Sequence, residues 1–448
     1  MITRRDFLRL SLLGTASLTA GFPKLFAQTP VKKWYKGNLH THNQWSDGKP
    51  MPEMAIDWYK SRGYQFLCPS DHNIFASSDL RFNAFGCNSE LSEAEKKEFD
   101  GETSFWKPLS KEEGWAKLEQ RSLDECAERF GADSIRTKQV GDRLFVRMKP
   151  FDELAEQFAE PEKFLMIPGF EQTGGIKLEG RQLHMNFINV RDSFPYIDAE
   201  TPFEGLRRTF AEGEQLFAGQ DYLFTANHPM WRYYDYSPSD LIQLPQIRIF
   251  EVLNNGVEKG LKQDKEAWTP EKFWDVVNAY RASHDQPLLF GMGSDDKHAF
   301  DTVKPCWSVV RAEKLETALL LAAIREGDMY ASSGLDFDDI SFDGKTLAVK
   351  INVHEEGNYK IEFIGTKKDY DPVCKTFQTE ATKTSYARTI EQYSDQIGIC
   401  LDTVEGTEGS YTLKPDDLYV RAKITKIGGK KEAGWRDNPG AWSQPYRG

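Results

Sequence analysis

The sequence predicts a mixed α/β fold that is followed by a smaller β-rich part. Short apolar runs alternate with helical stretches between about residues 34 and 338, which is typical of α/β domains. From residue 340 to residue 448, alternating runs at 347–353, 359–364 and 418–424 lack helical periods, so we expect a β-sandwich-like domain. The chain has 448 residues, 39% of them hydrophobic, which is enough for both parts.

The first part has a regular order of expected elements. The expected strands occupy residues 34–42, 64–70, 164–170, 183–190, 222–226, 247–253 and 287–292. Helices are expected at 52–62, ending before Gly63, at 270–283, with Thr269 as the N-cap and Pro270 as the first helical residue, and at 313–326, closed by Gly327.

Residues 75–161 interrupt this order with a charged segment rich in Glu and Lys, which we interpret as an insertion of helices and loops. The insertion follows His72 at a strand end and is far longer than an ordinary connection. One interpretation is a lid that sets substrate size, with Phe105 and Trp106 as candidate contacts. A peripheral decoration or an oligomer contact is the alternative.

The first thirty residues have the layout of an export signal. Adjacent arginines at residues 4 and 5 precede an apolar run to about Phe22, and residues 25–27 offer a small-residue cleavage site. We therefore expect a twin-arginine signal peptide at residues 1–27 and a periplasmic or otherwise exported protein without stable membrane insertion after cleavage. The alternative is a membrane anchor, although the run is short of the roughly 20 residues that a spanning helix needs.

The net charge and the cysteine spacing argue against two kinds of site, a nucleic-acid-binding surface and a thiolate zinc site. The net charge of −12 argues against a nucleic-acid partner, which needs a basic surface. The six cysteines show no CxxC spacing, so a thiolate zinc site is not expected. Cys374 and Cys400 are the one pair that we consider for a disulfide.

Histidines and carboxylates recur where expected strands end. His40 and His42 are two residues apart and therefore point to one face of their strand. The candidate ligands, in chain order, are His40, His42, Asp47, His72, Glu171, His184, His228, Asp296 and His298. Packing does not explain such recurrence, and catalytic residues of βα barrels converge from strand ends. Mixed nitrogen and oxygen ligands suit two to three divalent ions of Zn, Mn or Fe.

In this order the motifs resemble those of the polymerase and histidinol phosphatase (PHP) family. The matching residues are 38–42, 46–48, 70–73, Glu171, His184, 227–229 and 296–298, within roughly residues 35–335. The resemblance implies a distorted βα barrel of the PHP type, with a trinuclear metal centre at the C-terminal ends of its strands. The export signal and the β-rich tail also resemble an exported branch of the family that includes the carbaryl hydrolases.

The resemblance also implies three ligand sets. The first is His40, His42, Glu171 and Asp296; the second is Glu171, His184 and His228; the third is Asp47, His72 and His298. The position of Asp47 is often His in the family, so the third site is expected to be weaker or to take a different metal. Asp295 is an alternative to Asp296, although the D-x-H spacing favours Asp296.

These sets predict a metal-dependent hydrolase of a small-molecule ester. Two ions that share a carboxylate lower the pKa of a bridging water from about 15.7 toward roughly 7 and polarise the scissile oxygen. Glu171, Asp296 and His298 are the expected catalytic centre, and Asp71 is expected to orient a ligand. Arg232 and Lys297 are candidate contacts to an anionic substrate group, with surface ion pairs as the alternative for both.

The main interpretation of this chemistry is phosphoester hydrolysis. A carboxylic or carbamate ester hydrolase with the same metal chemistry is the first alternative. The second is a glycan-binding protein with structural metals, in which Trp435 and Trp442 of the β-rich part are candidate contacts. The substrate and the oligomeric state stay open.

Overall fold

The computed structural model describes most of the chain after the expected signal. The described residues are 31–77, 92–99, 105–114, 116–176, 181–230, 235–255, 269–300, 305–378, 380, 387, 389–428 and 439–448. The signal at residues 1–27, Cys87, Arg232 and Trp435 lie outside this set. Residues 32–448 form one compact unit. None of the described helices is both long enough and apolar enough to cross a membrane.

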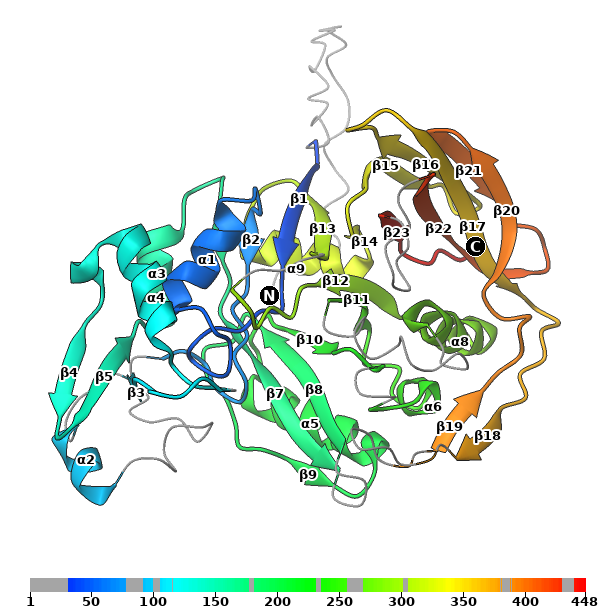
Figure 1. The fold of residues 1–448 in the computed structure, drawn as a ribbon. Helices are drawn as coiled ribbons and strands as arrows, with labels where there is room; N and C mark the ends of the chain where they lie inside the picture. The colour runs from blue at the N-terminus through cyan, green and yellow to red at the C-terminus, as the bar shows by residue number, and fades with distance from the viewer. Residues whose placement is uncertain are drawn as a thin grey trace, which may run out of the picture. The chain divides into compact units, whose positions relative to one another are not determined.

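Two large sheets confirm the mixed α/β class (Figure 1). The nine-stranded sheet contains, from edge to edge, β20 (Ile399–Glu405), β17 (Asn358–Lys367), β22 (Asp417–Ile427), β23 (Gly440–Ser443), β14 (Met329–Ser332), β13 (Trp307–Ala312), β1 (Lys33–Asn38), β2 (Phe66–Leu67) and β6 (Leu165–Met166). The six-stranded sheet contains β12 (Phe290–Ser294), β11 (Ile249–Asn254), β10 (Leu223–Ala226), β8 (Arg181–Ile188), β7 (Gly169–Ile176) and β9 (Asp198–Ala199).

Strand directions in these sheets differ from the all-parallel order of a regular βα barrel. The pairs β1–β2, β2–β6, β10–β11 and β11–β12 are parallel. The pairs β7–β8, β8–β10 and β1–β13 are antiparallel. The distorted barrel therefore stays a prediction, because the described strands are divided between two sheets of mixed direction.

Backbone contacts just beyond the strands bring the two sheets together. Thr41, after β1, forms an isolated parallel bridge with Lys297, after β12. Ser70 N donates to Thr41 O at 2.9 Å, and His72 forms a parallel bridge with Glu171 on β7. The ends of β12, β1, β2 and β7 thus lie side by side, although they are far apart in the sequence.

The three expected helices are present, although two of them are shorter than the expected 52–62 and 313–326. Helix α8 (Pro270–Ser283) begins after Thr269, whose hydroxyl accepts from Lys272 N at 3.2 Å as an N-cap. Helix α9 (Thr317–Glu326) ends at Gly327, which adopts the left-handed conformation with φ +73°. Helix α1 covers Pro52–Lys60.

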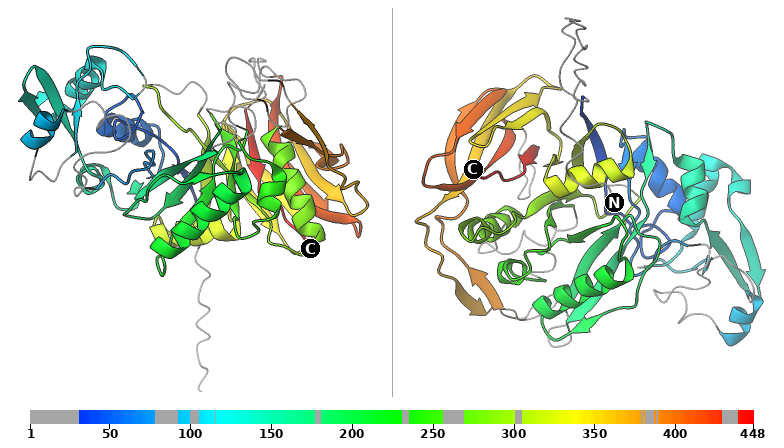
Figure 2. Two further views of the ribbon diagram at one scale, coloured as in Figure 1. Left: turned by 90° about the horizontal axis from the view of Figure 1, so that it is seen from below. Right: turned by 180° about the vertical axis from the view of Figure 1, so that it is seen from behind.

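Among the described residues of the first part, helices α5 (Pro202–Leu216) and α6 (Pro238–Ile242) were not named in the sequence prediction. Helix α5 packs on the hairpin of β7 and β8 (Figure 2). Its Gly213 permits this approach, because a Cβ there would lie 2.1 Å from Cε1 of Phe187.

The insertion is a small α/β unit rather than helices and loops alone. It contains α2 (Glu93–Glu98), β3 (Phe105–Pro108), α3 (Gln120–Phe130), the 3₁₀ helix η2 (Ala132–Ser134), β4 (Thr137–Val140), β5 (Arg143–Met148) and α4 (Phe151–Phe158). Strands β3, β5 and β4 form an antiparallel sheet. The sequence interpretation missed these strands because they are short and carry Lys and Arg between their apolar residues.

The C-terminal part is built from strands, as expected. A three-stranded sheet joins β15 (Asp336–Phe342), β16 (Thr346–Asn352) and β21 (Glu408–Thr412), and β18 (Lys375–Gln378) pairs with β19 (Thr389–Gln392). The nine-stranded sheet crosses the expected boundary near residue 338, since β14 pairs with β23. A separate sandwich-like domain therefore stays a prediction. The described cysteines are free, so Cys374 and Cys400 are not joined.

A buried network of ion pairs joins strand β22 to helix α8. Arg421, 1% exposed, donates from Nη2 and Nε to the two Asp275 oxygens at 2.7 and 2.9 Å. Its Nη2 also donates to Glu271 at 3.2 Å, and Lys423 donates to Glu271 at 2.6 Å. Burial raises the pKa of Glu271, but the two cations outweigh burial and lower it to about 2.

Glu271→Gln is expected to lower the free energy of unfolding by roughly 1–3 kcal/mol at pH 7, because Gln keeps the shape and loses the charge-assisted bonds. Since the folded pKa lies below the usual value of about 4.3, this stability is present above pH 5 and is lost as the pH falls toward 2. Urea unfolding of the unaltered protein and of Glu271→Gln across this pH range measures the difference in the free energy of unfolding. A difference that stays constant with pH would contradict the assignment.

Candidate metal centre

All nine expected ligand residues lie in the described part, and their side chains converge at the strand ends. They come from the segment after β1, from the segment after β2, from β7 and β8, and from the segments after β10 and β12. His298 is 36% exposed in its side chain, and the other eight side chains are at most 8% exposed. The protein thus buries a dense set of imidazoles and carboxylates.

The first group joins His40, His42, Glu171 and Asp296. The Nε2 atoms of His40 and His42 lie 3.0 Å apart. Asp296 Oδ1 lies 3.3 Å from His40 Nε2 and 3.0 Å from His42 Nε2. Glu171 lies 3.1 Å from His40 Nε2 through Oε1 and 3.3 Å from His42 Nε2 through Oε2. Potential ligand atoms of four residues therefore face one small volume.

Glu171 also belongs to the second group. Its Oε1 lies 3.2 Å from His184 Nδ1 and 3.6 Å from His228 Nε2. Its Oε2 lies 2.9 Å from His72 Nδ1. Glu171 therefore contacts donors of both groups, and its role as a bridging ligand stays a prediction.

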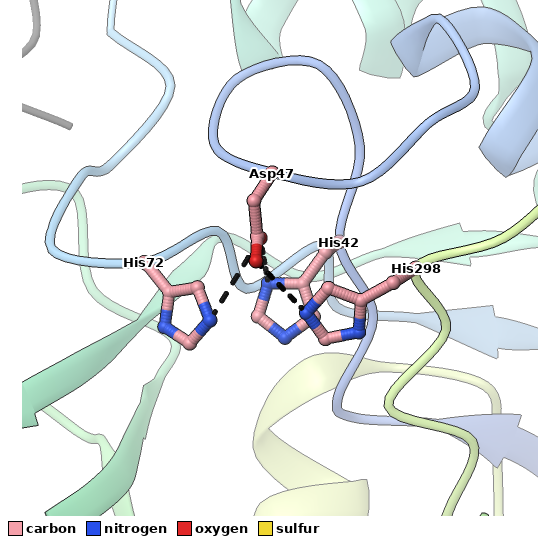
Figure 3. A group of neighbouring side chains, drawn as sticks. All are labelled: His42, Asp47, His72 and His298. Atoms are coloured by element: carbon pink, nitrogen blue, oxygen red, sulfur yellow. Dashed lines mark ion pairs between the residues drawn. The ribbon is translucent and has the colours of Figure 1, made fainter. Parts of the chain in front are cut away.

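The third group surrounds Asp47 (Figure 3). Asp47 Oδ2 lies 3.3 Å from His298 Nε2, and Oδ1 lies 3.8 Å from both His72 Nε2 and His42 Nδ1. The His42 ring stacks on His298 and on His72, with centroids 4.1 and 4.4 Å apart. His42 thus faces the first group with Nε2 and the third with Nδ1, which the sequence did not indicate.

The donor atoms fit metal ions better than they fit one another. His42 Nδ1, Glu171 Oε2 and Asp296 Oδ1 are buried and form no hydrogen bond of good geometry. A buried polar atom without a partner costs about 1–3 kcal/mol, which a bound cation would offset. Imidazole and carboxylate donors are those that divalent transition metals prefer. The groups therefore indicate divalent metal ions.

Electrostatics in the centre favour ionised carboxylates. Burial and the neighbouring imidazoles of His298 and His72 lower the pKa of His42 to about 3. Burial also lowers the pKa of His298, but Asp296 and Asp47 outweigh it and raise the value to about 10. The pKa of Glu171 lies well below its usual value, since the imidazoles around it outweigh its burial. Metal binding must therefore displace protons from part of the cluster.

Glu251 is a residue beside the candidate centre that the sequence interpretation missed. It lies on β11, is 1% exposed, and its Oε1 lies 2.7 Å from His40 Nδ1. In the neutral form of His40 that binds a metal ion, a proton on Nδ1 would be donated to Glu251, and the lone pair of Nε2 would face the first group. His228 N donates to Glu251 Oε2 at 3.0 Å, and Ser294 Oγ donates to Oε1. A carboxylate within the apolar strand Ile249–Asn254 was the available signal.

Two neighbouring aspartates have structural roles. Asp71 Oδ1 accepts from Asn43 N and Ser46 N, both at 3.0 Å, and so holds the loop that carries Asp47. Asp295 accepts from Cys306 N at 2.7 Å and points away from the cluster. Asp296, the preferred candidate, is the one that faces the histidines.

Lys297 contacts the centre through its backbone, where its O accepts from His42 N at 3.0 Å. Its Nζ lies 4.0 Å from the centroid of Trp58, and the residue is 2% exposed. The expected contact to an anionic substrate is wrong for this residue. Arg232, the other candidate, lies outside the described residues.

The proposed lid contacts are also wrong, because both aromatic residues are buried in the insertion. Phe105 is 0% exposed and stacks on Trp45 at 4.9 Å. Trp106 is 5% exposed and packs on Phe99 at 5.7 Å.

Comparison with known proteins gives only distant structural likenesses. No family model matches the sequence, and no curated protein matches it. A two-domain protein from Bacteroides vulgatus, containing a predicted PHP-like metal-dependent phosphoesterase, is 14% identical with a TM-score of 0.38, over 88% of this chain and 90% of that one.

Two further solved structures overlap a smaller share of the chain. A proposed metal-dependent phosphoesterase from Bifidobacterium adolescentis is 12% identical with a TM-score of 0.27, over 60% of this chain and 89% of that one. An amidohydrolase from Chromobacterium violaceum, with bound sulfate and no metal, is 12% identical with a TM-score of 0.25, over 59% of this chain and 87% of that one. Overlaps this low do not define a shared fold, so the centre is assigned from its own side chains.

Glu251→Gln is expected to weaken metal binding roughly 10- to 100-fold, because the variant loses the charged acceptor that orients His40. Isothermal titration with Mn²⁺ and Zn²⁺ measures this. Glu362→Gln, on β17 and outside the centre, is the matched control. Equal affinities for Glu251→Gln and the unaltered protein would show that His40 needs no such partner.

Proposed function

We propose that the chain is an exported, metal-dependent phosphoesterase with a di- or trinuclear centre of Zn, Mn or Fe. The observation that carries this proposal is the position of one fully buried carboxylate among five imidazoles. Glu171 lies within 3.6 Å of ring nitrogens of His40, His42, His72, His184 and His228. A shared carboxylate with this many nitrogen donors suits two adjacent cations.

The three groups support a proposed set of ligands for each ion. His40, His42, Asp296 and Glu171 would hold the first ion, and Glu171, His184 and His228 the second. Asp47, His72 and His298 would hold a third. Held by these residues, divalent ions would supply Lewis-acid chemistry, a water with a pKa of about 7 and charge stabilisation at a phosphoryl oxygen.

The protein's own residues orient and shield this chemistry. Glu251 fixes the ring of His40, and Asn227 Nδ2 donates to Glu171 Oε1 at 2.7 Å. Burial of Glu171 excludes bulk water, which strengthens electrostatic interactions in the centre. His298 is the most exposed of the nine ligand residues and marks the side from which a small-molecule ester reaches the centre.

The fold that we propose for the part that carries the centre is the distorted βα barrel. Its support is the series of backbone contacts that joins the ends of β12, β1 and β2 to β7. From there, pairing continues through β8, β10 and β11 back to β12. Export is proposed from the arginine pair and apolar run of residues 1–27.

The same centre could act on carboxylic or carbamate esters, and a substrate panel distinguishes the two. We expect p-nitrophenyl phosphate or a phosphodiester to be hydrolysed faster than aryl esters by the metal-loaded protein. The reverse order would favour the carboxylic or carbamate ester alternative. For the glycan-binding alternative, Trp442 does not provide a sugar contact, because it is 2% exposed and belongs to the core.

The mature protein is expected to carry two to three transition-metal ions per chain, since nine ligand residues form three groups. Elemental analysis of protein produced with added Mn, Fe and Zn measures this number. Less than one ion per chain under every condition would contradict the proposal.

Glu171→Gln is expected to lower kcat/KM roughly 100- to 1000-fold, because Glu171 contacts both the first and the second group. Asp47→Asn is expected to cost about tenfold, because Asp47 serves the third group only. Both variants are measured at saturating metal. Equal losses, or a larger loss for Asp47→Asn, would contradict these roles.

A further inference from the structure

Asp47 differs from the other ligands because it lies in a loop. Residues 43–49 turn back on themselves, with Ser46 N and Gly48 N donating to Asn43 O at 3.1 and 3.0 Å. Asp71 accepts from Asn43 and Ser46 and holds the inner side of the loop. The position of Asp47 therefore depends on what holds the outer side.

The insertion holds the outer side of this loop. Lys107, on β3, is 2% exposed and donates from Nζ to Gln44 O at 3.1 Å and to Ser46 O at 2.8 Å. The carbonyl of Ser46 belongs to the peptide unit that leads into Asp47. The ammonium group of Lys107 thus fixes the orientation of the backbone at a third-group ligand.

Other contacts from the insertion reach the same loop. Trp45 stacks on Phe105 and donates from Nε1 to Lys149 O at 2.8 Å. Lys49 forms an ion pair with Glu119, and Ser122 Oγ donates to Lys49 O at 2.8 Å. These contacts come from β3, from the start of α3 and from the end of β5, so the folded insertion as a unit supports the loop.

The ligands of the first two groups have a different support. Glu171 and His184 lie within the paired strands β7 and β8. The backbone at His40 is held by Asp296 N, which donates to His40 O at 3.0 Å. Loss of the insertion contacts should therefore affect the third group most.

We infer that the insertion is a positioning element for the third metal site, with Lys107 as its central residue. This inference rests on the proposed metal centre. It assigns the inserted segment a role in setting how many ions the protein binds. Lys107 acts through the loop backbone and Asp47, so it is a positioning residue.

Lys107→Met removes the ammonium group and keeps the apolar stem, and Lys138→Met is the matched control. Lys138 lies on β4 of the same insertion, and its Nζ donates to Glu98 O at 2.6 Å, outside the loop. We expect the unaltered protein and Lys138→Met to bind three Mn²⁺ ions. Lys107→Met should bind two with unchanged affinity and the third at least tenfold more weakly. Isothermal titration and elemental analysis after dialysis measure both quantities, without any substrate.

Two further variants make the test independent of folding defects. Lys107→Arg keeps a donor cation and should restore the third ion in part. Adding Asp47→Asn to Lys107→Met should weaken the third ion no further than Asp47→Asn alone, because both act on one site. Circular dichroism and the thermal midpoint of each variant show whether it is folded. If Lys107→Met does not fold, Trp45→Phe, which loses the bond to Lys149 O, takes its place with the same expectation.

The outcomes separate this inference from the proposed function. Three ions bound by Lys107→Met with unaltered affinity would overturn the inference, and so would an equal loss of all three. An unaltered protein that binds two ions would overturn the inference and leave a dinuclear hydrolase. An unaltered protein that binds no ion would overturn the proposed function and this inference with it.

Discussion

The buried charge of Glu171 is the constraint on which the centre depends. A carboxylate that is 0% exposed is costly unless positive charge or hydrogen-bond donors surround it. Five imidazoles and the amide of Asn227 provide that environment. Without a metal, some of these rings must hold protons to compensate the charge. Divalent ions replace those protons, so metal binding and the stability of the strand ends are linked.

Carboxylates hold two kinds of position around this centre. Glu171 and Asp296 face the Nε2 atoms of His40 and His42, whereas Glu251 contacts Nδ1 of His40 and Asp71 contacts the loop before Asp47. Glu251 limits the orientation of the His40 ring, and Asp71 holds the loop that carries Asp47. Ligand geometry therefore also depends on buried carboxylates outside the nine candidate ligands.

Spacing between neighbouring residues was enough to predict which of their side chains face the same group. His40 and His42, two residues apart, do face one group, and Asp296 rather than Asp295 faces them. Contacts between distant segments left no such signal. Glu251 meets His40 across 211 residues, and β14 pairs with β23 across the expected domain boundary. The short strands of the insertion were also missed, because their charged residues conceal the alternation. Pairing over such distances depends on register and topology, which one sequence does not display.

Across the three groups, the exposure of the ligand side chains varies with the backbone that carries them, a paired strand or a loop. Glu171 is fully buried on a paired strand, whereas the third group reaches the surface at His298, 36% exposed, and includes the loop residue Asp47. A ligand on a paired strand has little freedom to lose when an ion binds. A ligand on a loop must be ordered first, and its ordering lowers the affinity unless other contacts have already fixed it. The contacts from the insertion fix that loop in advance. The least buried group of candidate ligands is thus tied to a segment outside the two large sheets, so sequence changes in that segment would act on this group first.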